Sequence, residues 1–181
     1  MVGKLGLGSA LQALGAAVVA ALIFALGAGA SPSPNVSFSA SNDGASAHWS
    51  QGNGSPIDLT VGSNSATTYA LITLHHVAGV TVGDLAEPTF STDNYNAGSP
   101  RYYITLSDGH SLWGYPSNSG LNGMDFAWAI DNGNTYLSWT AVQAAEGSAS
   151  VTGAWVIADG DQAAGTTDVI SGLQFNGTFF N

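Results

Sequence analysis

Hydrophobic and polar residues alternate along much of the chain after residue 35, and a period of two residues is the pattern of a β-strand. Glycine, asparagine and aspartate residues separate these runs, as in Asn42-Asp43-Gly44 and Asn176-Gly177. The pattern predicts strands over residues 36–40, 45–49, 57–61, 68–77, 149–158 and 178–180. Many short strands at this spacing predict an all-β fold, an antiparallel β-sandwich or jelly roll.

One segment departs from this alternation. Residues 135–145 carry several alanines, follow Asn134, whose residue type caps helix N-termini, and precede Gly147, whose residue type ends helices. The pattern favours one short helix at this place. A further strand through residues 136–139 is the alternative.

Residues 102–115 predict a β-hairpin, because Asp108-Gly109 between two alternating runs is typical of a two-residue turn. This turn places Ser107 opposite His110 and continues with the pairs Leu106–Ser111, Ile104–Trp113 and Tyr102–Tyr115. Paired residues share a face. One face then belongs to the core and carries Tyr102, Ile104, Leu106, Trp113 and Tyr115. The other is half polar, meets water and carries Arg101, Tyr103, Thr105, Ser107, His110 and Leu112.

Aromatic residues elsewhere divide into core and surface groups. Alternating positions predict a core location for Trp113, Phe126, Trp128 and Trp155. Tyr103, Tyr95 and Trp139 are expected to face outward. Carbohydrate-binding modules stack sugar rings on such aromatic side chains and bind the sugar hydroxyls with polar ones. The predicted partner is therefore an extracellular or cell-wall glycan, and the ligand-binding candidates are Tyr95, Arg101, Tyr103, His110 and Trp139.

The first 30 residues have the pattern of a secretory signal peptide. Lys4 supplies a positive start, residues 13–26 are an unbroken apolar run, and Ala28-Gly29-Ala30 fits a signal peptidase site. We expect cleavage after Ala30 and a secreted protein that has no membrane contact afterwards. The alternative is an uncleaved membrane anchor, since residues 5–30 contain no charge.

Cleavage at this point divides the chain into three parts. Residues 1–30 are the signal peptide, residues 31–35 are a Ser/Pro linker, and residues 36–181 are one β-sandwich domain. A body of this size is long enough to bury one ordinary hydrophobic core. Its oligomeric state does not follow from the sequence.

The charge balance excludes several partners. The chain has 2 Lys+Arg, 12 Asp+Glu and a formal net charge of −10, and Arg101 is the one strongly basic residue after Lys4. Nucleic-acid binding needs several Lys or Arg side chains to displace counterions from phosphates, so we expect none. The same deficit disfavours docking to anionic lipids. Because the chain has no cysteine, it has no disulfide, thiolate metal site or cysteine nucleophile.

Recognisable catalytic motifs are missing from the sequence. It contains neither the Gly-x-Ser-x-Gly elbow of serine hydrolases nor a His-Glu-x-x-His metal motif. His75 and His76 are neighbours on a predicted strand and point to opposite faces, so they cannot bind one ion together. Glycosidases need two carboxylates across a cleft, but Glu87 and Glu146 lie outside the aromatic strands.

We therefore expect a secreted, acidic, non-catalytic module and assign no catalytic residue. A structural or self-associating envelope protein is the first alternative. A small secreted glycoside hydrolase is the second.

Three aspartates near the C-terminus are candidate calcium ligands. Asp159, Asp161 and Asp168 fall in one acidic loop between predicted strands, and carboxylate oxygens are ligands that Ca²⁺ prefers. Their spacing does not fit an EF-hand. The alternative is a solvated acidic turn in which the aspartates cap backbone amides. No other cofactor is expected.

Residues 98–176 resemble a set of exported proteins of high-GC Gram-positive bacteria that have no assigned activity. The matching segments are Gly98-Ser99-Pro100-Arg101, Ser107-Asp108-Gly109-His110, Phe126-Ala127-Trp128-Ala129 and the run from Val156 to Asp168. The resemblance implies secretion and a β-sandwich. It implies no reaction and no functional residue.

Overall fold

The computed structural model describes residues 35–180, apart from 64–66, 96–99, 122–123 and 161. The signal peptide expected over residues 1–30 and most of the linker lie outside the described residues. No helix in the described part of the chain is both long and apolar enough to cross a lipid bilayer.

The described residues form mainly strands. They are β1 (Val36–Ala40), β2 (Ser46–Trp49), β3 (Ile57–Thr60), β4 (Tyr69–Leu74), β5 (Thr89–Thr92), β6 (Arg101–Leu106), β7 (Ser111–Leu121), β8 (Met124–Ile130), β9 (Val151–Asp159), β10 (Thr167–Phe175) and β11 (Thr178–Phe179). A short 3-10 helix, η1 (Val82–Asp84), precedes β5, and α2 (Trp139–Glu146) precedes β9.

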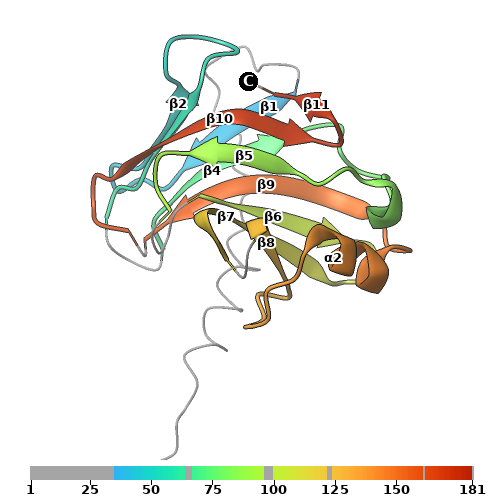
Figure 1. The fold of residues 1–181 in the computed structure, drawn as a ribbon. Coiled ribbons are helices and arrows are strands. Elements are labelled where there is room, and N and C mark those ends of the chain that lie inside the picture. The colour runs from blue at the N-terminus through green and yellow to red at the C-terminus, as the bar shows by residue number, and fades with distance from the viewer. Residues whose placement is uncertain (1–34, 64–66, 96–99, 122–123, 161, 181) are drawn as a thin grey trace, which may run out of the picture. The chain divides into compact units, whose positions relative to one another are not determined.

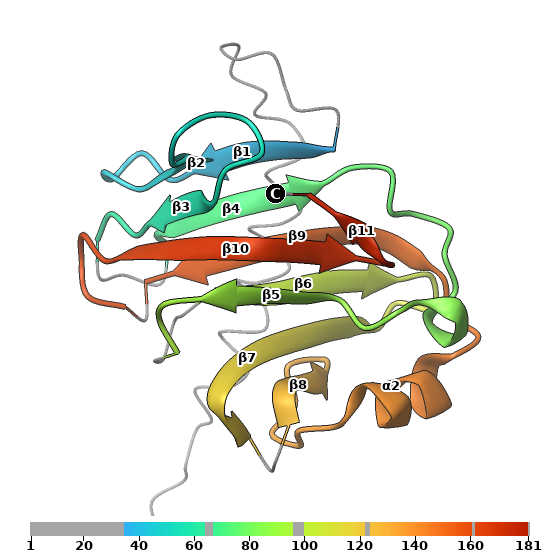
Figure 2. The ribbon, with the colours of Figure 1, turned by 45° about the horizontal axis from the view of Figure 1, so that its top comes forward.

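Two antiparallel sheets make up the body of the protein (Figure 1). The six-stranded sheet has the order β1-β4-β9-β6-β7-β8. In the five-stranded sheet β10 is central and pairs with β3, β5 and β11, while β2 pairs with β3. Figure 2 shows β10 and β5 lying over β9 and β6. The prediction of an antiparallel β-sandwich with a short helix is confirmed.

The core lies between the two sheets and is rich in aromatic and branched side chains. Tyr102 of β6 is fully buried there, and its ring stacks on Trp128 of β8 with centroids 6.0 Å apart. The Tyr102 hydroxyl donates a hydrogen bond of 2.7 Å to the backbone oxygen of Gln174 in β10. Burial raises the pKa of this phenol well above its ordinary value. Tyr102 therefore links the two sheets through both packing and a hydrogen bond.

The β6–β7 hairpin forms, but its predicted register is wrong by one residue. The Leu106 N–H donates to the His110 carbonyl and the Gly109 N–H donates to the Leu106 carbonyl, so the turn contains three residues, 107–109. Gly109 has a φ of 94°, as expected for the last position of such a turn. Tyr103 consequently pairs with Trp113, and Tyr102 pairs with Gly114. A slip of one residue moves every β7 side chain to the opposite face.

Trp113 and Tyr115 thus lie on the outer face of the six-stranded sheet, by which we mean the face turned away from the five-stranded sheet. Gly114 takes the core position instead. A Cβ atom there would stand 2.7 Å from the Trp128 ring and 2.8 Å from the Phe126 ring. The core prediction was correct for Phe126 and Trp128 and wrong for Trp113 and Tyr115.

A second irregularity changes the phase of β9. Thr105 pairs with Gly153, whereas Leu106 pairs with Val151, which makes Thr152 an extra residue in a β-bulge. Val151 and Ala154 both face the core across this bulge, so Trp155 points outward. The predicted core location of Trp155 is therefore wrong.

Helix α2 begins later than the sequence predicts. Its N-cap is Ser138, whose side chain accepts a hydrogen bond of 3.3 Å from the Ala141 N–H, and not Asn134. Leu137 just before it exchanges two backbone hydrogen bonds with Trp128 of β8, which keeps this residue extended. The helix ends at Gly147 as predicted. This stretch therefore contains both a short extended segment and a helix, which we had considered as alternatives.

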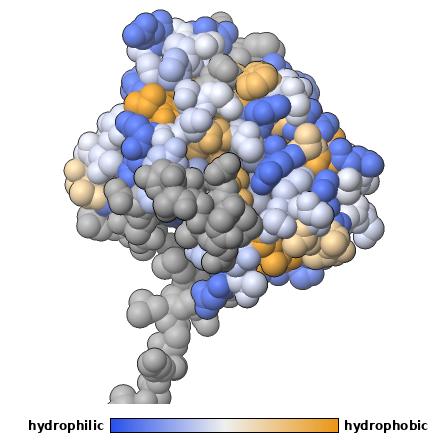
Figure 3. Space-filling model, in the orientation of Figure 1, coloured by the Kyte–Doolittle hydropathy of each residue, from blue (hydrophilic) through white to orange (hydrophobic). Residues whose placement is uncertain are grey.

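The surface seen in Figure 3 mixes hydrophobic and hydrophilic residues. The orange areas are separated by blue and white residues and do not merge into one large apolar patch on that side. Charged residues make up only 8% of the chain, so most of its hydrophilic side chains are uncharged.

Candidate functional site

Three aromatic side chains form a row across the outer face of the six-stranded sheet. Trp155 of β9, Tyr103 of β6 and Trp113 of β7 are directly paired neighbours in adjacent strands. The Tyr103 ring centroid lies 5.6 Å from that of Trp155 and 4.7 Å from that of Trp113. Both tryptophans are half-buried, and none of the three belongs to the core cluster between the sheets. We call Trp155, Tyr103 and Trp113 the aromatic row.

Polar groups flank the aromatic row. The Arg101 guanidinium forms an ion pair with the Asp159 carboxylate, and its Cζ lies 5.6 Å from the centroid of the Trp113 ring. The hydroxyls of Thr105 and Thr152 share a hydrogen bond of 2.7 Å. This arrangement combines an aromatic surface with a few fixed polar groups, as is typical of binding sites for small polar molecules.

His110 and Asp131 extend this polar margin. His110 Nδ1 donates to Asp131 Oδ2 at 2.6 Å, and the Ser111 N–H donates to Asp131 Oδ1 at 2.9 Å. The hydrogen bond to Asp131, helped by the Asp131 charge, raises the pKa of His110. The Ser111 hydroxyl in turn accepts from Trp113 Nε1 at 3.2 Å, which connects this pair to the aromatic row.

Arg101, Tyr103 and His110 thus lie on one continuous surface, but the structure corrects the expectation that Tyr103 meets water. Only 8% of Tyr103 is exposed, because the rings of Trp113 and Trp155 flank it. Sequence reasoning missed both tryptophans. A signal for Trp113 was present in Gly109, which suits a three-residue turn as well as a two-residue one.

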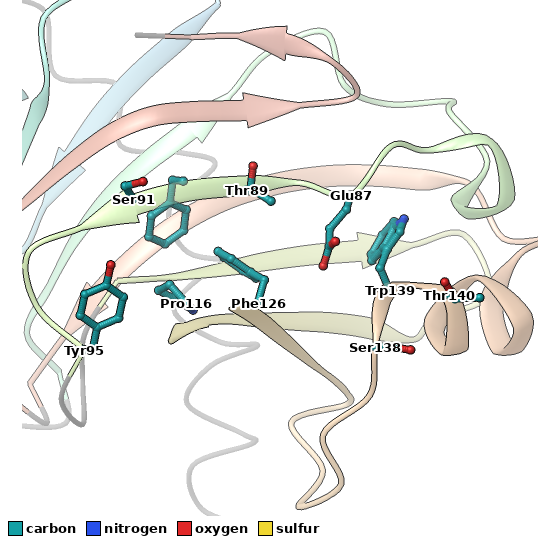
Figure 4. A pocket seen from close by; sticks show the side chains of 10 residues that line it. Glu87, Thr89, Ser91, Tyr95, Pro116, Phe126, Ser138, Trp139 and Thr140 are labelled. Carbon is teal, nitrogen blue, oxygen red and sulfur yellow. The ribbon is translucent and has the colours of Figure 1, made fainter. Parts of the chain in front are cut away.

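The other two ligand-binding candidates, Tyr95 and Trp139, lie at a separate cavity of about 540 Å³ (Figure 4). The cavity is lined by Glu87, Thr89, Phe90, Ser91, Tyr95, Pro116, Phe126, Ser138, Trp139 and Thr140. Tyr95 is 38% exposed, in agreement with its predicted outward position. Trp139 is only 8% exposed, so its predicted outward position is wrong. Its Nε1 donates to the Leu85 carbonyl at 3.0 Å, which satisfies the indole N–H inside the protein.

Glu87 lies outside the strands, as predicted, but it lines this cavity together with aromatic side chains. Its Oε1 accepts a hydrogen bond of 2.9 Å from Trp128 Nε1. Glu146, the other glutamate, lies at the opposite end of α2, where burial and a hydrogen bond with Asp108 raise its pKa. The two glutamates are therefore not paired across one cleft.

The structure separates the described members of the predicted calcium loop. Asp159 pairs with Arg101 on the outer face. Asp168 is fully buried and accepts hydrogen bonds of 2.7 Å from both Asn94 Nδ2 and Gln162 Nε2. Asp161 lies outside the described residues. Within the described part of the chain, no group of three or more His, Asp or Glu side chains is arranged to hold a metal ion.

Comparison of the chain with protein-family models, with curated proteins and with solved structures gave no significant match.

Proposed function

We propose that this protein is an exported, non-catalytic module that binds glycans on the aromatic row. The observation that carries the proposal is the juxtaposition of Trp155, Tyr103 and Trp113 on adjacent strands, outside the core. Apolar aromatic residues gathered at a surface mark an interaction site.

The chemistry of the row fits a sugar. The faces of aromatic rings carry partial negative charge and attract the polarised C–H groups on a face of a pyranose. The hydroxyls of Thr105 and Thr152 flank the aromatic row and can form hydrogen bonds with sugar hydroxyls. The ion pair with Asp159 and the contact with the Trp113 ring hold the Arg101 guanidinium in place beside the aromatic row.

The overall charge narrows the choice of glycan. A net charge of −10 repels polyanionic chains such as sulfated or uronic-acid polysaccharides. Neutral or amine-bearing polysaccharides are therefore the favoured class.

Export is part of the same proposal and rests on the sequence of residues 1–30. We expect the protein in the culture medium of a producing cell, with an N-terminus at or near Ser31. Mass spectrometry of the secreted chain measures this directly. An intact N-terminus retained in the membrane fraction would favour the alternative of an uncleaved anchor.

The binding surface is tested with the variants Trp113→Ala and Trp155→Ala in retention assays on cellulose, chitin, xylan and peptidoglycan. Loss of one stacking contact is expected to weaken binding about two- to tenfold. Phe179→Ala is the matched control, because Phe179 is an aromatic residue 64% exposed on β11 of the other sheet. We expect the control to bind like the unmodified protein.

Two results would contradict the proposal. If none of the four polysaccharides retains the unmodified protein, the ligand class is wrong. If both tryptophan variants bind as well as the control, the aromatic row is not the binding surface.

A further inference from the structure

The cavity at the N-terminal end of α2 is separate from the aromatic row and has its own chemistry. We propose that it binds the ammonium group of an amino sugar, with Glu87 as the counter-charge. The sugar part of this inference rests on the proposed glycan-binding function. The ammonium part rests on the cavity alone.

Glu87 is positioned to receive a cation. The hydrogen bond from Trp128 Nε1 to its Oε1 fixes the carboxylate at the cavity wall, and Figure 4 shows the carboxylate directed into the cavity. None of the ion pairs among the described residues involves Glu87. A carboxylate shielded from water by protein on one side gains more from a cation than a fully solvated one does.

Aromatic side chains line the same cavity as this carboxylate. Phe90, Phe126 and Trp139 are each less than 9% exposed, and their rings are held by contacts with one another and with Trp128. Tyr95 adds a more exposed ring at the margin. A cation placed near the faces of such rings gains cation–π attraction in addition to the charge of Glu87.

The size of the cavity suits a ligand larger than a bare ammonium ion. Its volume of about 540 Å³ is within the usual range for small-molecule sites. A bare ammonium ion would use the carboxylate and the rings but would fill little of this volume. An amino sugar also fills the volume, and the net charge of −10 favours its approach.

The experiment follows the tryptophan indole N–H signals of the full domain by NMR during titration with an oligomer of glucosamine. The same oligomer with every amine acetylated is the matched probe, because acetylation removes the charge and keeps the sugar. Trp128 and Trp139 report on the cavity, whereas Trp113 and Trp155 report on the aromatic row. Signals are assigned from single Trp→Phe variants.

Glu87→Gln is the decisive variant, since glutamine still offers an oxygen to Trp128 Nε1 but carries no charge. Glu146→Gln makes the same charge change at the far end of α2 and serves as control. Thr140→Lys, at an exposed lining position, places a lysine amine at the cavity and keeps the test open if Glu87→Gln is poorly folded.

We expect the glucosamine oligomer to shift the Trp128 and Trp139 signals with an affinity at least about tenfold higher than the acetylated form. That difference should vanish in Glu87→Gln and Thr140→Lys and persist in Glu146→Gln. Absent shifts at Trp128 and Trp139, equal shifts with both probes, or full binding by Glu87→Gln would overturn the inference. Shifts of the Trp113 and Trp155 signals test glycan binding at the aromatic row independently of the cavity.

Discussion

Hydrogen bonds and burial shift the pKa values of individual carboxylates in this protein. Asp168 is buried between the sheets, and burial raises its pKa although Gln162 and Asn94 both donate to it. At Asp131 burial acts in the same direction, but hydrogen bonds from His110 and Ser111 outweigh it and the pKa is lowered. The pKa shifts of the two carboxylates therefore have opposite signs, because burial dominates at Asp168 and hydrogen bonding dominates at Asp131.

The His110–Asp131 pair predicts a pH dependence. Because the folded-state pKa of His110 is raised from 6.5, its stabilising contribution is complete below 6.5 and is lost as the pH rises through the folded pKa. Asp131→Asn should lower the NMR titration midpoint of the His110 ring toward 6.5. Asp58→Asn, in β3 of the other sheet, should leave this midpoint unchanged. An unchanged midpoint in Asp131→Asn would show that the pair does not form in solution.

At the scale of the strands, two irregularities of one residue decide which side chains face outward. The three-residue turn before β7 places Trp113 on the outer face, and the bulge at Thr152 does the same for Trp155. Two glycines leave room for aromatic rings on opposite faces of this sheet. A Cβ atom at Gly153 would stand 2.3 Å from the outward-facing Trp155 ring, whereas one at Gly114 would meet the core rings of Trp128 and Phe126.

These two glycines predict contrasting variants. Gly114→Ala overpacks the core against Trp128 and Phe126 and should lower the free energy of unfolding by about 1–3 kcal/mol. Gly153→Ala should displace the half-buried Trp155 ring into solvent at a smaller cost, and should weaken glycan retention. Urea denaturation and the retention assay separate the two effects. Equal destabilisation by both variants would contradict the assignment of the two faces.

At the scale of the whole molecule, two sheets with no disulfide are held together by packing and by cross-sheet hydrogen bonds. Tyr102 contributes to both, since its ring packs against Phe90 of the opposite sheet and its hydroxyl donates to Gln174. Its neighbour Tyr103 faces the other way and belongs to the aromatic row. Of these two adjacent tyrosines, Tyr102 packs in the core and Tyr103 packs on the outer face.

Removing the hydroxyl is expected to have different effects at the two tyrosines. Tyr102→Phe removes the hydroxyl that links the sheets and should lower the free energy of unfolding by about 0.5–1.5 kcal/mol. Tyr103→Phe is the control and should leave it nearly unchanged, since the described residues give its hydroxyl no hydrogen bond across the sheets. Thermal and urea unfolding of both variants provide the comparison. A larger loss in Tyr103→Phe would argue against the cross-sheet role of Tyr102.

Much of the fold could be predicted from the sequence. The period of two residues and the turn residues between runs identified several strands and the sandwich, and the alanine-rich stretch ending at Gly147 identified the helix. For the candidate site, the pattern placed Arg101 and Tyr103 on the same face of the hairpin, which the register agrees with. Tyr102, Ile104, Phe126 and Trp128 were correctly placed in the core.

Tertiary structure alone decided the phase of the alternation. A period of two fixes which residues share a face, but not which face is buried after a turn or bulge that adds one residue. Pairing of β6 with β9 and β7 sets those positions, and so turns Trp113 and Trp155 outward. Likewise, Glu87 and Trp139 are distant in sequence and line one cavity because α2 packs against η1, which shortly precedes Glu87. Contacts between residues far apart along the chain depend on how the sheets pack, and local sequence pattern carries no such information.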